Sequence, residues 1–185
     1  MPNSIPITYA EIAKVYPRRL TKSGEFGGKL DHPRLREFMN STPGTPCCVQ
    51  VSHAFNMVGH LVSKKYQGMR RDASPIKIDG RTLYYLLAVD EMEAWLTDTY
   101  GPGEVLRGPG NKNATPIQIK SAIKNRPGLL TLWGKKDRWH TEFWNGARYL
   151  QDDMSDGILE NPRIMFWDLS LAPPAWLSDY MAGSP

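Results

Sequence analysis

The sequence predicts an α+β fold in which a helical N-terminal part packs on a small antiparallel sheet. Up to about residue 126, apolar side chains recur with the three- and four-residue spacing of amphipathic helices. After that point they gather in short runs rich in aromatic and branched residues, which are typical of strands. With 185 residues, the chain has the size of one domain with its own core. We therefore expect a single domain, helical over about 1–126 and sheet-forming over about 127–185.

Proline and glycine mark where the helices of the first part begin and end. Thr45 and Thr115 are suited to cap helices that start with Pro46 and Pro116, because proline has no N–H to satisfy at the first helical position. Two stretches rich in turn-forming residues, 72–81 and 105–114, are expected to be loops. Helices are expected at residues 7–16, 33–39, 47–62, 84–100 and 116–123.

Four runs in the second part are predicted to be strands that follow one another as an antiparallel meander. Asn145-Gly146 is a strong signal for a hairpin turn between the second strand and the third. The strands are expected at residues 128–133, 138–144, 147–150 and 163–169.

The charge of the chain indicates a mildly basic surface, since 23 Lys and Arg face 19 Asp and Glu and the net charge is +4. A basic surface attracts anionic partners such as nucleic acid, membranes or acidic wall polymers, and charge alone does not choose among them. The basic residues are scattered and not clustered with stacking aromatic residues, which disfavours a nucleic-acid-binding module. The apolar runs are too short to span a bilayer. From these two observations together, we expect neither a nucleic acid nor a membrane as partner.

Export signals, disulfides and metal ligands are not expected. The N-terminal residues lack a basic start followed by a long apolar stretch, which a secretory signal peptide would show. Cys47 and Cys48 are the two cysteines, and adjacent thiols cannot join distant parts of a fold. The spacings typical of metal ligands do not occur, so we expect neither a metal nor another cofactor.

Cys47 is the strongest candidate for a nucleophile. The apolar stripe of the helix at 47–62, extended back by four residues from Val51, reaches Cys47, whereas Cys48 is rotated by about 100°. A thiol in the first turn lies at the positive end of the helix dipole, which stabilises the reactive thiolate. The free N–H groups of that turn are also suited to hold an oxyanion.

A catalytic thiol also needs a base within hydrogen-bonding distance. The two histidines of the same helix lie too far from its first turn, and His32 is expected in a surface turn. His140 lies in a predicted strand, which is a rigid platform for a base. Depending on whether the hairpin turn has two or three residues, Gln151 or Asp152 would face His140 and orient its ring.

The same residues also have a purely structural interpretation. A cysteine at a helix start is commonly a small buried residue, and a histidine in a strand is commonly structural. The combination favours catalysis, because a helix cysteine, a later strand histidine and a polar third residue follow the chain order of papain-like cysteine hydrolases.

Two motifs resemble those of the type VI secretion amidase effectors of family 4, the Tae4 effectors. Residues 47–56, CCVQVSHAFN, resemble the nucleophile helix C-A-x-R-x-S-x-A-L-N of that family. Residues 139–146, WHTEFWNG, resemble its strand G-H-x-x-L-W-N/D-G. The run at 127–132 and the helix opened by Thr115 also fit, so the resemblance spans about 44–153.

The resemblance implies a compact NlpC/P60-type papain-like amidase that cleaves the γ-D-glutamyl–meso-diaminopimelate bond of peptidoglycan stem peptides. Cys47 would be the nucleophile, His140 the base and Asp152 the orienting acid, with Gln151 as the alternative. The family also implies synthesis in the cytoplasm, delivery by the type VI secretion apparatus, action in the periplasm of a target bacterium, and a cognate immunity protein as partner.

The chain departs from the family pattern at three positions. Cys48 stands where the family usually has Ala, Gln50 where it has Arg, and Trp139 where it has Gly. The cysteine-to-serine spacing and the apolar stripe both favour Cys47 over Cys48 as the nucleophile. Two other functions compete with the effector hypothesis, namely a housekeeping NlpC/P60-type wall hydrolase and a non-catalytic basic binding module.

Overall fold

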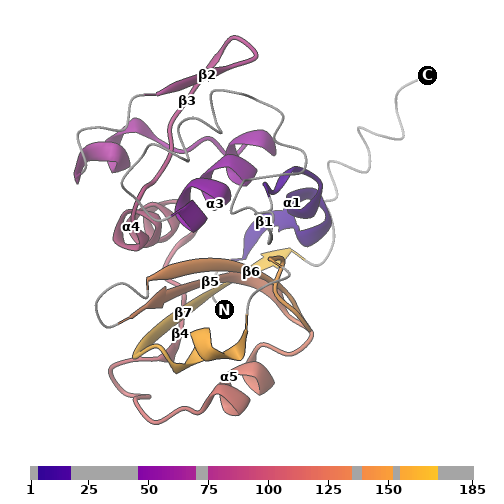
Figure 1. The fold of residues 1–185 in the computed structure, drawn as a ribbon, viewed down its shortest axis with the longest axis vertical. Coiled ribbons are helices and arrows are strands. Elements are labelled where there is room, and N and C mark those ends of the chain that lie inside the picture. The colour runs from indigo at the N-terminus through magenta and orange to yellow at the C-terminus, as the bar shows by residue number, and fades with distance from the viewer. Residues whose placement is uncertain (1–3, 18–45, 70–74, 135–138, 152–154, 171–185) are drawn as a thin grey trace.

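The computed structural model describes residues 4–17, 46–69, 75–134, 139–151 and 155–170. The expected helix at 33–39 and the cap at Thr45 lie outside these residues, and so does Asp152. Figure 1 shows a central sheet between two layers of helices, which confirms the predicted α+β class. Helices α1 (Tyr9–Val15), α3 (Pro46–Met57) and α4 (Val89–Tyr100) lie on one side of the sheet, and helix α5 (Pro116–Ala122) lies on the other.

The five-stranded sheet is mixed, and its central strand is β7 (Arg163–Ser170). On one side β7 pairs antiparallel with β5 (Pro127–Trp133), which in turn pairs antiparallel with the edge strand β6 (His140–Asn145). On its other side β7 pairs antiparallel with β4 (Glu104–Arg107) and parallel with β1 (Ile5–Thr8). The antiparallel pairing of β5 with β6 was expected, whereas the parallel strand β1 was not.

The N-terminal segment was wrongly predicted to be helical from residue 7. Ile5 and Ile7 are buried while Pro6 between them is exposed, which is the two-residue period of a strand. Thr8 then caps α1, because its Oγ1 accepts the Glu11 N–H at 3.2 Å while the Glu11 carboxylate accepts the Thr8 N–H at 2.7 Å. This capping box fixes the point at which the strand ends and the helix begins.

Two stretches that were expected to be loops contain strands. Within 72–81, β2 (Ile76–Ile78) and β3 (Arg81–Leu83) form a hairpin whose turn residues Asp79 and Gly80 have φ values of 48° and 76°. Two successive residues with positive φ match the twist of paired strands. Within 105–114, the first residues belong to β4. These strands are so short that alternation of apolar and polar residues gives little signal.

Two helices are shorter than predicted, and one predicted strand is not formed. Helix α3 ends at Met57, just before Gly59 with a φ of 89°. Helix α4 begins at Val89 instead of residue 84, because the preceding residues bond to α3 through the Leu86 N–H. The run at 147–150 makes only an isolated bridge between Trp144 and Tyr149. The helix at 116–123 and the Thr115 cap are confirmed, with the helix ending at Ala122.

Apolar clusters fill the space on both faces of the sheet. Phe55 of α3 and Trp95 of α4 pack with the sheet residue Phe143 in the larger cluster. Ile119 of α5 and Phe166 of β7 belong to the cluster on the opposite face. Because α3 lies between the sheet and other elements, all of its residues from Cys47 to Asn56 are buried. Its N-terminal turn is therefore held in one place against the sheet.

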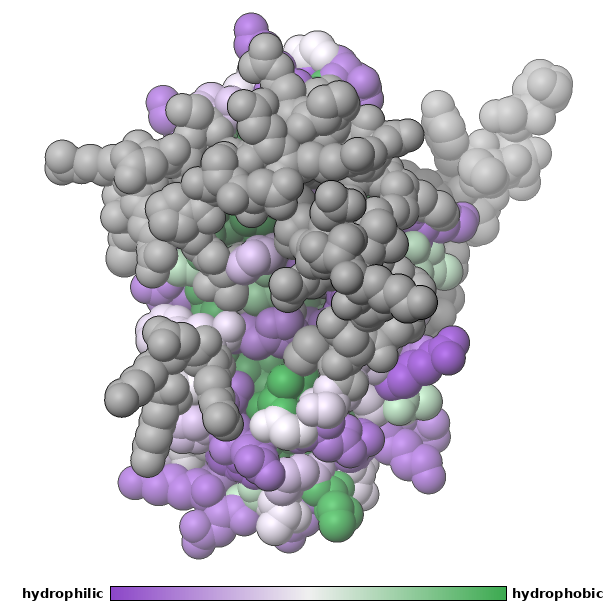
Figure 2. All heavy atoms as spheres, in the orientation of Figure 1, coloured by the Kyte–Doolittle hydropathy of each residue, from purple (hydrophilic) through white to green (hydrophobic). Residues whose placement is uncertain are grey.

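Few large apolar side chains of the described residues are exposed. Among the described residues, Leu61, Val105 and Ile117 are large apolar side chains that are exposed. On the face drawn in Figure 2, hydrophilic side chains surround the apolar ones near α5. None of the described helices is long and apolar enough to cross a membrane.

Candidate active site

Hydrogen bonds to the segment before α4 hold α3 in position. Ser52 Oγ donates to the Cys48 carbonyl at 2.7 Å and accepts the Leu86 N–H at 3.0 Å. One turn later, Asn56 Nδ2 donates to the Tyr84 carbonyl at 2.8 Å. These polar side chains are buried with their partners, which makes their position specific and costly to change. The result is a fixed helix whose first turn carries both thiols.

The N-terminal turn of α3 lies against the outer edge of β6. The backbone N–H of Thr141 donates to Cys47 Sγ at 3.3 Å, and Thr141 Oγ1 lies 3.9 Å from Cys48 Sγ. An edge strand has backbone N–H groups with no strand partner. Here one of them is used to bind the sulfur atom of Cys47, so the sheet edge contributes directly to the site.

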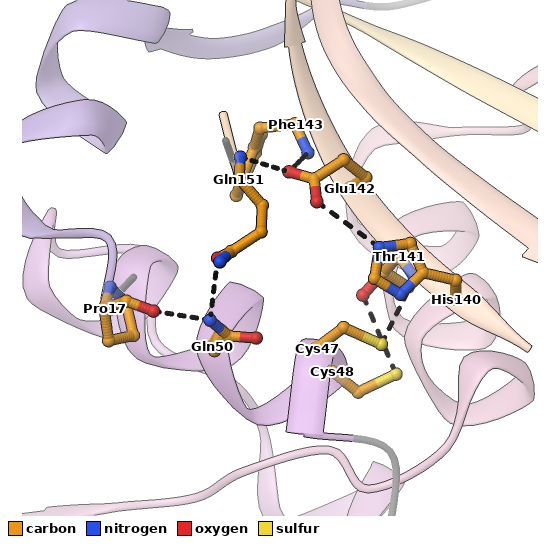
Figure 3. Close-up of polar contacts among 9 residues, drawn as sticks. All are labelled: Pro17, Cys47, Cys48, Gln50, His140, Thr141, Glu142, Phe143 and Gln151. Atoms are coloured by element: carbon orange, nitrogen blue, oxygen red, sulfur yellow. Dashed lines mark hydrogen bonds and ion pairs between the residues drawn. The ribbon is translucent and has the colours of Figure 1, made fainter. Parts of the chain in front are cut away.

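The structure brings Cys47 and His140 together, as the sequence predicts. Cys47 Sγ accepts the backbone N–H of Thr141, the residue after His140, and Cys47 and His140 shift the pKa of each other. Figure 3 shows the imidazole of His140 between the Cys47 sulfur and the Glu142 carboxylate. Cys47 is 5% exposed and Cys48 is fully buried, so Cys47 is the more accessible of the two thiols.

The two thiols ionise very differently. Burial raises the pKa of the Cys47 thiol, but this effect is exceeded by hydrogen bonds from Cys48, His140 and Thr141 and by the charge of His140, so its pKa lies well below 9.0. Burial also raises the pKa of the Cys48 thiol, and the neighbouring Cys47 raises it further, so Cys48 stays protonated. Cys47 is therefore the thiolate, and Cys48 is a hydrogen-bond donor to it.

His140 is the positive partner of that thiolate. Burial by itself lowers the pKa of His140, but the charge of Cys47 and the hydrogen bonds to Cys47 and Glu142 raise it to about 10. A lowered thiol pKa beside a raised imidazole pKa favours the thiolate–imidazolium form of this pair. This is the form in which a cysteine is nucleophilic without prior proton transfer.

Glu142 is a member of the site that the sequence analysis missed. Its side chain is 0% exposed, and its Oε2 lies 3.3 Å from His140 Nε2. Burial raises the pKa of Glu142, while hydrogen bonds and charge from His140 lower it in part. The signal for this contact was present, because residues two apart in a strand lie on the same side. It was overlooked because the third residue was sought across the hairpin.

The predicted hairpin register is wrong. Asn145 N–H donates to the Arg148 carbonyl and Leu150 N–H donates to the Phe143 carbonyl, so the turn is centred on Gly146-Ala147 instead of Asn145-Gly146 and the register is shifted by two residues. Asn145 Oδ1 stabilises this turn, since it accepts the N–H groups of both Ala147 and Arg148 at 2.9 and 2.8 Å. As a consequence Gln151 does not lie opposite His140.

Gln151 lies beside Glu142 instead. Its backbone N–H donates to Glu142 Oε1 at 3.3 Å, and its side-chain oxygen accepts a hydrogen bond of 3.5 Å from Gln50 Nε2. Gln50 also donates to the Pro17 carbonyl at 2.5 Å, which ties the end of α1 to the site. The predicted third residue, Asp152, lies outside the described residues.

An aromatic pair holds the strands together next to His140. Trp133 at the end of β5 and Trp139 just before β6 pack with ring centroids 4.3 Å apart. Trp133 Nε1 donates to Glu93 Oε1 at 2.6 Å, and the Arg163 guanidinium lies 4.6 Å above the Trp133 ring. Such aromatic and cation–π contacts are each worth about 0.5–1.5 kcal/mol. They fix the end of the sheet from which His140 extends.

Among the described residues, no group of three or more His, Cys, Asp or Glu side chains is placed to hold a metal ion. The chemistry that the described groups can perform by themselves is nucleophilic attack by a sulfur atom, with proton transfer by an imidazole.

Solved structures of Tae4 effectors share the fold of this chain. A chain of the Tae4–Tai4 effector–immunity complex from Enterobacter cloacae matches with a TM-score of 0.58 at 18% identity, over 92% of this chain and 100% of that one. Tae4 alone from Enterobacter cloacae matches with a TM-score of 0.55 at 17% identity, again over 92% and 100%. A chain of the Tae4–Tai4 system from Salmonella typhimurium matches with a TM-score of 0.57 at 15% identity, over 89% of this chain and 99% of that one.

The comparisons by sequence found no counterpart, since the chain matches no family profile and no curated relative. The structural matches extend over most of the chain. The resemblance to the Tae4 effectors is thus confirmed at the level of the fold.

Proposed function

We propose that this protein is a cysteine amidase of the Tae4 type that cleaves the γ-D-glutamyl–meso-diaminopimelate bond of peptidoglycan stem peptides. The observation that carries the proposal is the thiolate–imidazolium pair of Cys47 and His140, set at a helix N-terminus in a fold shared with Tae4 effectors. A thiolate in this position is an acyl-transfer nucleophile and requires no metal.

The first half of the reaction forms an acyl-enzyme. The Cys47 thiolate attacks the carbonyl carbon of the scissile amide, and the carbonyl oxygen becomes an oxyanion. The N–H groups of the first turn of α3 have no acceptor within the helix and carry the positive end of its dipole, so they stabilise that oxyanion. His140 gives its proton to the leaving amine, and the C–N bond breaks to leave a thioester on Cys47.

The second half releases the acid product. His140 is now neutral, so it accepts a proton from a water molecule that attacks the thioester carbonyl. The resulting tetrahedral intermediate expels the Cys47 thiolate, and the proton on His140 restores the original ion pair. The cycle consumes one water molecule and produces one carboxylic acid and one amine.

The test is digestion of purified muropeptides followed by mass spectrometry. We expect products split between the γ-D-glutamyl residue and diaminopimelate, and we expect Cys47→Ala and His140→Ala to lower the rate by at least about 10³-fold without unfolding the protein. Full cleavage by a folded Cys47→Ala variant would exclude the mechanism. Cleavage at another bond would exclude the proposed substrate position but not the chemistry.

We also propose that the enzyme acts as an antibacterial effector. By analogy with the Tae4 effectors, the type VI secretion apparatus would deliver it from the producing cytoplasm to the periplasm of a rival cell, and a cognate immunity protein would protect the producer. Expression in Escherichia coli with an added periplasmic signal peptide should lyse the cells, whereas the His140→Ala variant should not. Equal growth with both proteins in the periplasm would contradict the effector role.

A further inference from the structure

We propose that Glu142, which lies two residues after His140 on β6, is the positioning residue that orients the His140 imidazole and stabilises its charged form. This inference rests on the proposed function, because it names the third member of the same site. It replaces Asp152, which the sequence resemblance suggests for that role.

The geometry places the three groups in a row. His140 Nε2 lies 3.3 Å from Glu142 Oε2, and the other side of the ring faces Cys47 (Figure 3). With Nε2–H donating to a carboxylate, the other ring nitrogen is free to exchange a proton with the sulfur atom. The orientation of the imidazole is therefore set from the same strand that carries it.

The carboxylate of Glu142 is itself held in place by the backbone. Its Oε1 accepts the N–H of Phe143 at 2.9 Å and the N–H of Gln151 at 3.3 Å. Both partners are donors only, so Oε1 must be an acceptor. The cost of enclosing a fully buried carboxylate is offset in part by these two bonds and by His140 at its other oxygen. Glu142 is thus oriented as a hydrogen-bond acceptor toward His140.

Gln151 supports Glu142 and does not take its place. It approaches Glu142 through its backbone N–H, while its side chain lies against Gln50 (Figure 3). Because Asn145 pairs with Arg148 and Phe143 with Leu150, the segment after the turn places Gln151 beside Glu142 and not opposite His140. Glu142, on the same strand as His140, therefore takes the role that was expected of a residue after the hairpin turn.

The charged and titratable groups around the pair come from several elements. His140 interacts with Cys47 of α3 and with Glu142 of its own strand. Cys48 acts on Cys47, and Glu91 of α4 acts on Cys48. Tyr149, after the hairpin turn, interacts with Glu142. Among these groups, Glu142 is the carboxylate that is hydrogen-bonded to His140, so its removal has a specific and predictable effect on that residue.

The experiment compares Glu142→Gln with the wild type. Glutamine has the size of glutamate, and its side-chain oxygen can still accept the two backbone N–H groups. Its side-chain NH₂ group then faces His140 Nε2 and points an N–H toward it. That contact favours the tautomer with the proton on the nitrogen facing Cys47, which cannot accept the thiol proton. We expect kcat to fall by about 10²–10⁴-fold with little change in KM, and the His140 pKa, followed by NMR, to fall by about 1–3 units.

Two matched controls separate orientation from general disturbance. Glu104→Gln makes the same chemical change at a carboxylate outside the site, where it pairs with Arg126, and should change kcat by less than about threefold. Asp152→Asn tests the acid suggested by the resemblance and should leave the His140 pKa unchanged. Glu142→Asp restores the negative charge with a shorter side chain and should recover part of both kcat and the His140 pKa.

The outcomes are distinguishable. A Glu142→Gln variant with wild-type kcat and an unchanged His140 titration would overturn the inference. It would also be overturned if Asp152→Asn, and not Glu142→Gln, lowered both kcat and the His140 pKa. If Glu142→Gln does not fold, the wild-type titration decides, because His140 with an ordinary pKa near 6.5 would contradict the contact with Glu142. Failure of the wild type to cleave muropeptides would refute the proposed function, while the NMR titration would still test the role of Glu142.

Discussion

The adjacent thiols of Cys47 and Cys48 differ in ionisation because they have different neighbours. Cys47 is next to an imidazolium and accepts the Thr141 N–H, whereas Cys48 is fully buried beside the negative charge of Cys47. The sequence indicated Cys47 from the apolar stripe, which reaches back to it, and from the cysteine-to-serine spacing of the motif. The electrostatic reason could not be predicted, because it depends on residues about ninety positions later.

The first prediction concerns the rates at which iodoacetamide alkylates Cys47 and Cys48. The pKa of Cys47 is lowered, so its thiolate persists as the pH falls below 9.0 and is lost only below the depressed value. At about pH 6 we expect Cys47 to react at least about tenfold faster than a free cysteine, and Cys48 to stay unmodified. Peptide mapping by mass spectrometry measures both sites. Faster labelling of Cys48 would reverse the assignment.

A second prediction concerns Cys48→Ala. The variant removes the S–H that donates to the Cys47 sulfur, so the pKa of Cys47 should rise. We expect the alkylation profile to move to higher pH while muropeptide cleavage falls by less than about tenfold. Cys47→Ala serves as the control that abolishes cleavage. Loss of cleavage in a folded Cys48→Ala protein, with cleavage retained in Cys47→Ala, would make Cys48 the nucleophile.

At the scale of elements, the edge strand β6 and its turn determine how the site is assembled. The location of the strand and the presence of a turn at Asn145-Gly146 were predictable from local residue types. The register of the turn was not, because it depends on two backbone N–H groups that donate to the Asn145 side chain. That register places Gln151 beside Glu142 and not opposite His140.

The close packing of β5 on β7 gives a prediction about stability. A Cβ atom on Gly128 would lie 2.1 Å from the Phe166 ring and 2.6 Å from the Trp167 carbonyl oxygen. Gly128→Ala must therefore displace side chain and backbone, and we expect it to destabilise the protein by about 1–3 kcal/mol. Gly157→Ala is the control, since its nearest contact is Ser155 Oγ at 3.4 Å. Similar thermal unfolding curves for both variants would contradict this packing argument.

For the whole molecule, the α+β class and the position of most helices followed from periodicity, whereas the sheet topology did not. Strand β1 joins β7 through pairs such as Ile5 with Leu169, which are separated by most of the chain. Local patterns carry no information about such a contact. The short strands β2, β3 and β4 were missed for a different reason, because three or four residues contain too little alternation to stand out.

The ion pair of the site also predicts how the stability of the whole molecule depends on pH. Because the pKa of His140 is raised, its contribution to stability is fully present below pH 6.5 and is lost as the pH rises through about 10. The lowered pKa of Cys47 stabilises it fully above 9.0, and this contribution is lost as the pH falls toward the depressed value. Between pH 6.5 and 9.0 the stabilising contribution of His140 falls as the pH rises, while that of Cys47 increases. The two changes therefore cancel.

We therefore expect the difference in Tm between the wild type and Cys47→Ala to be nearly constant from about pH 6.5 to 9 and to shrink on either side. Differential scanning calorimetry over this range measures it, with Cys48→Ala as the variant whose difference should not show this plateau. A difference that changes steadily through neutral pH would show that the thiolate and imidazolium are not paired in the folded protein.

The central strand of the sheet is also the last one in the described chain, and this order has a consequence for biosynthesis. A nascent polypeptide that has passed His140 already contains both reacting groups, yet β1, β4 and β5 still lack the strand that joins them. The β5–β6 pair can form before β7 is made, but the five-stranded sheet is complete only once residues 163–170 have been synthesised. We therefore expect a fragment that ends before β7 to lack a stable sheet beneath the thiol and the imidazole.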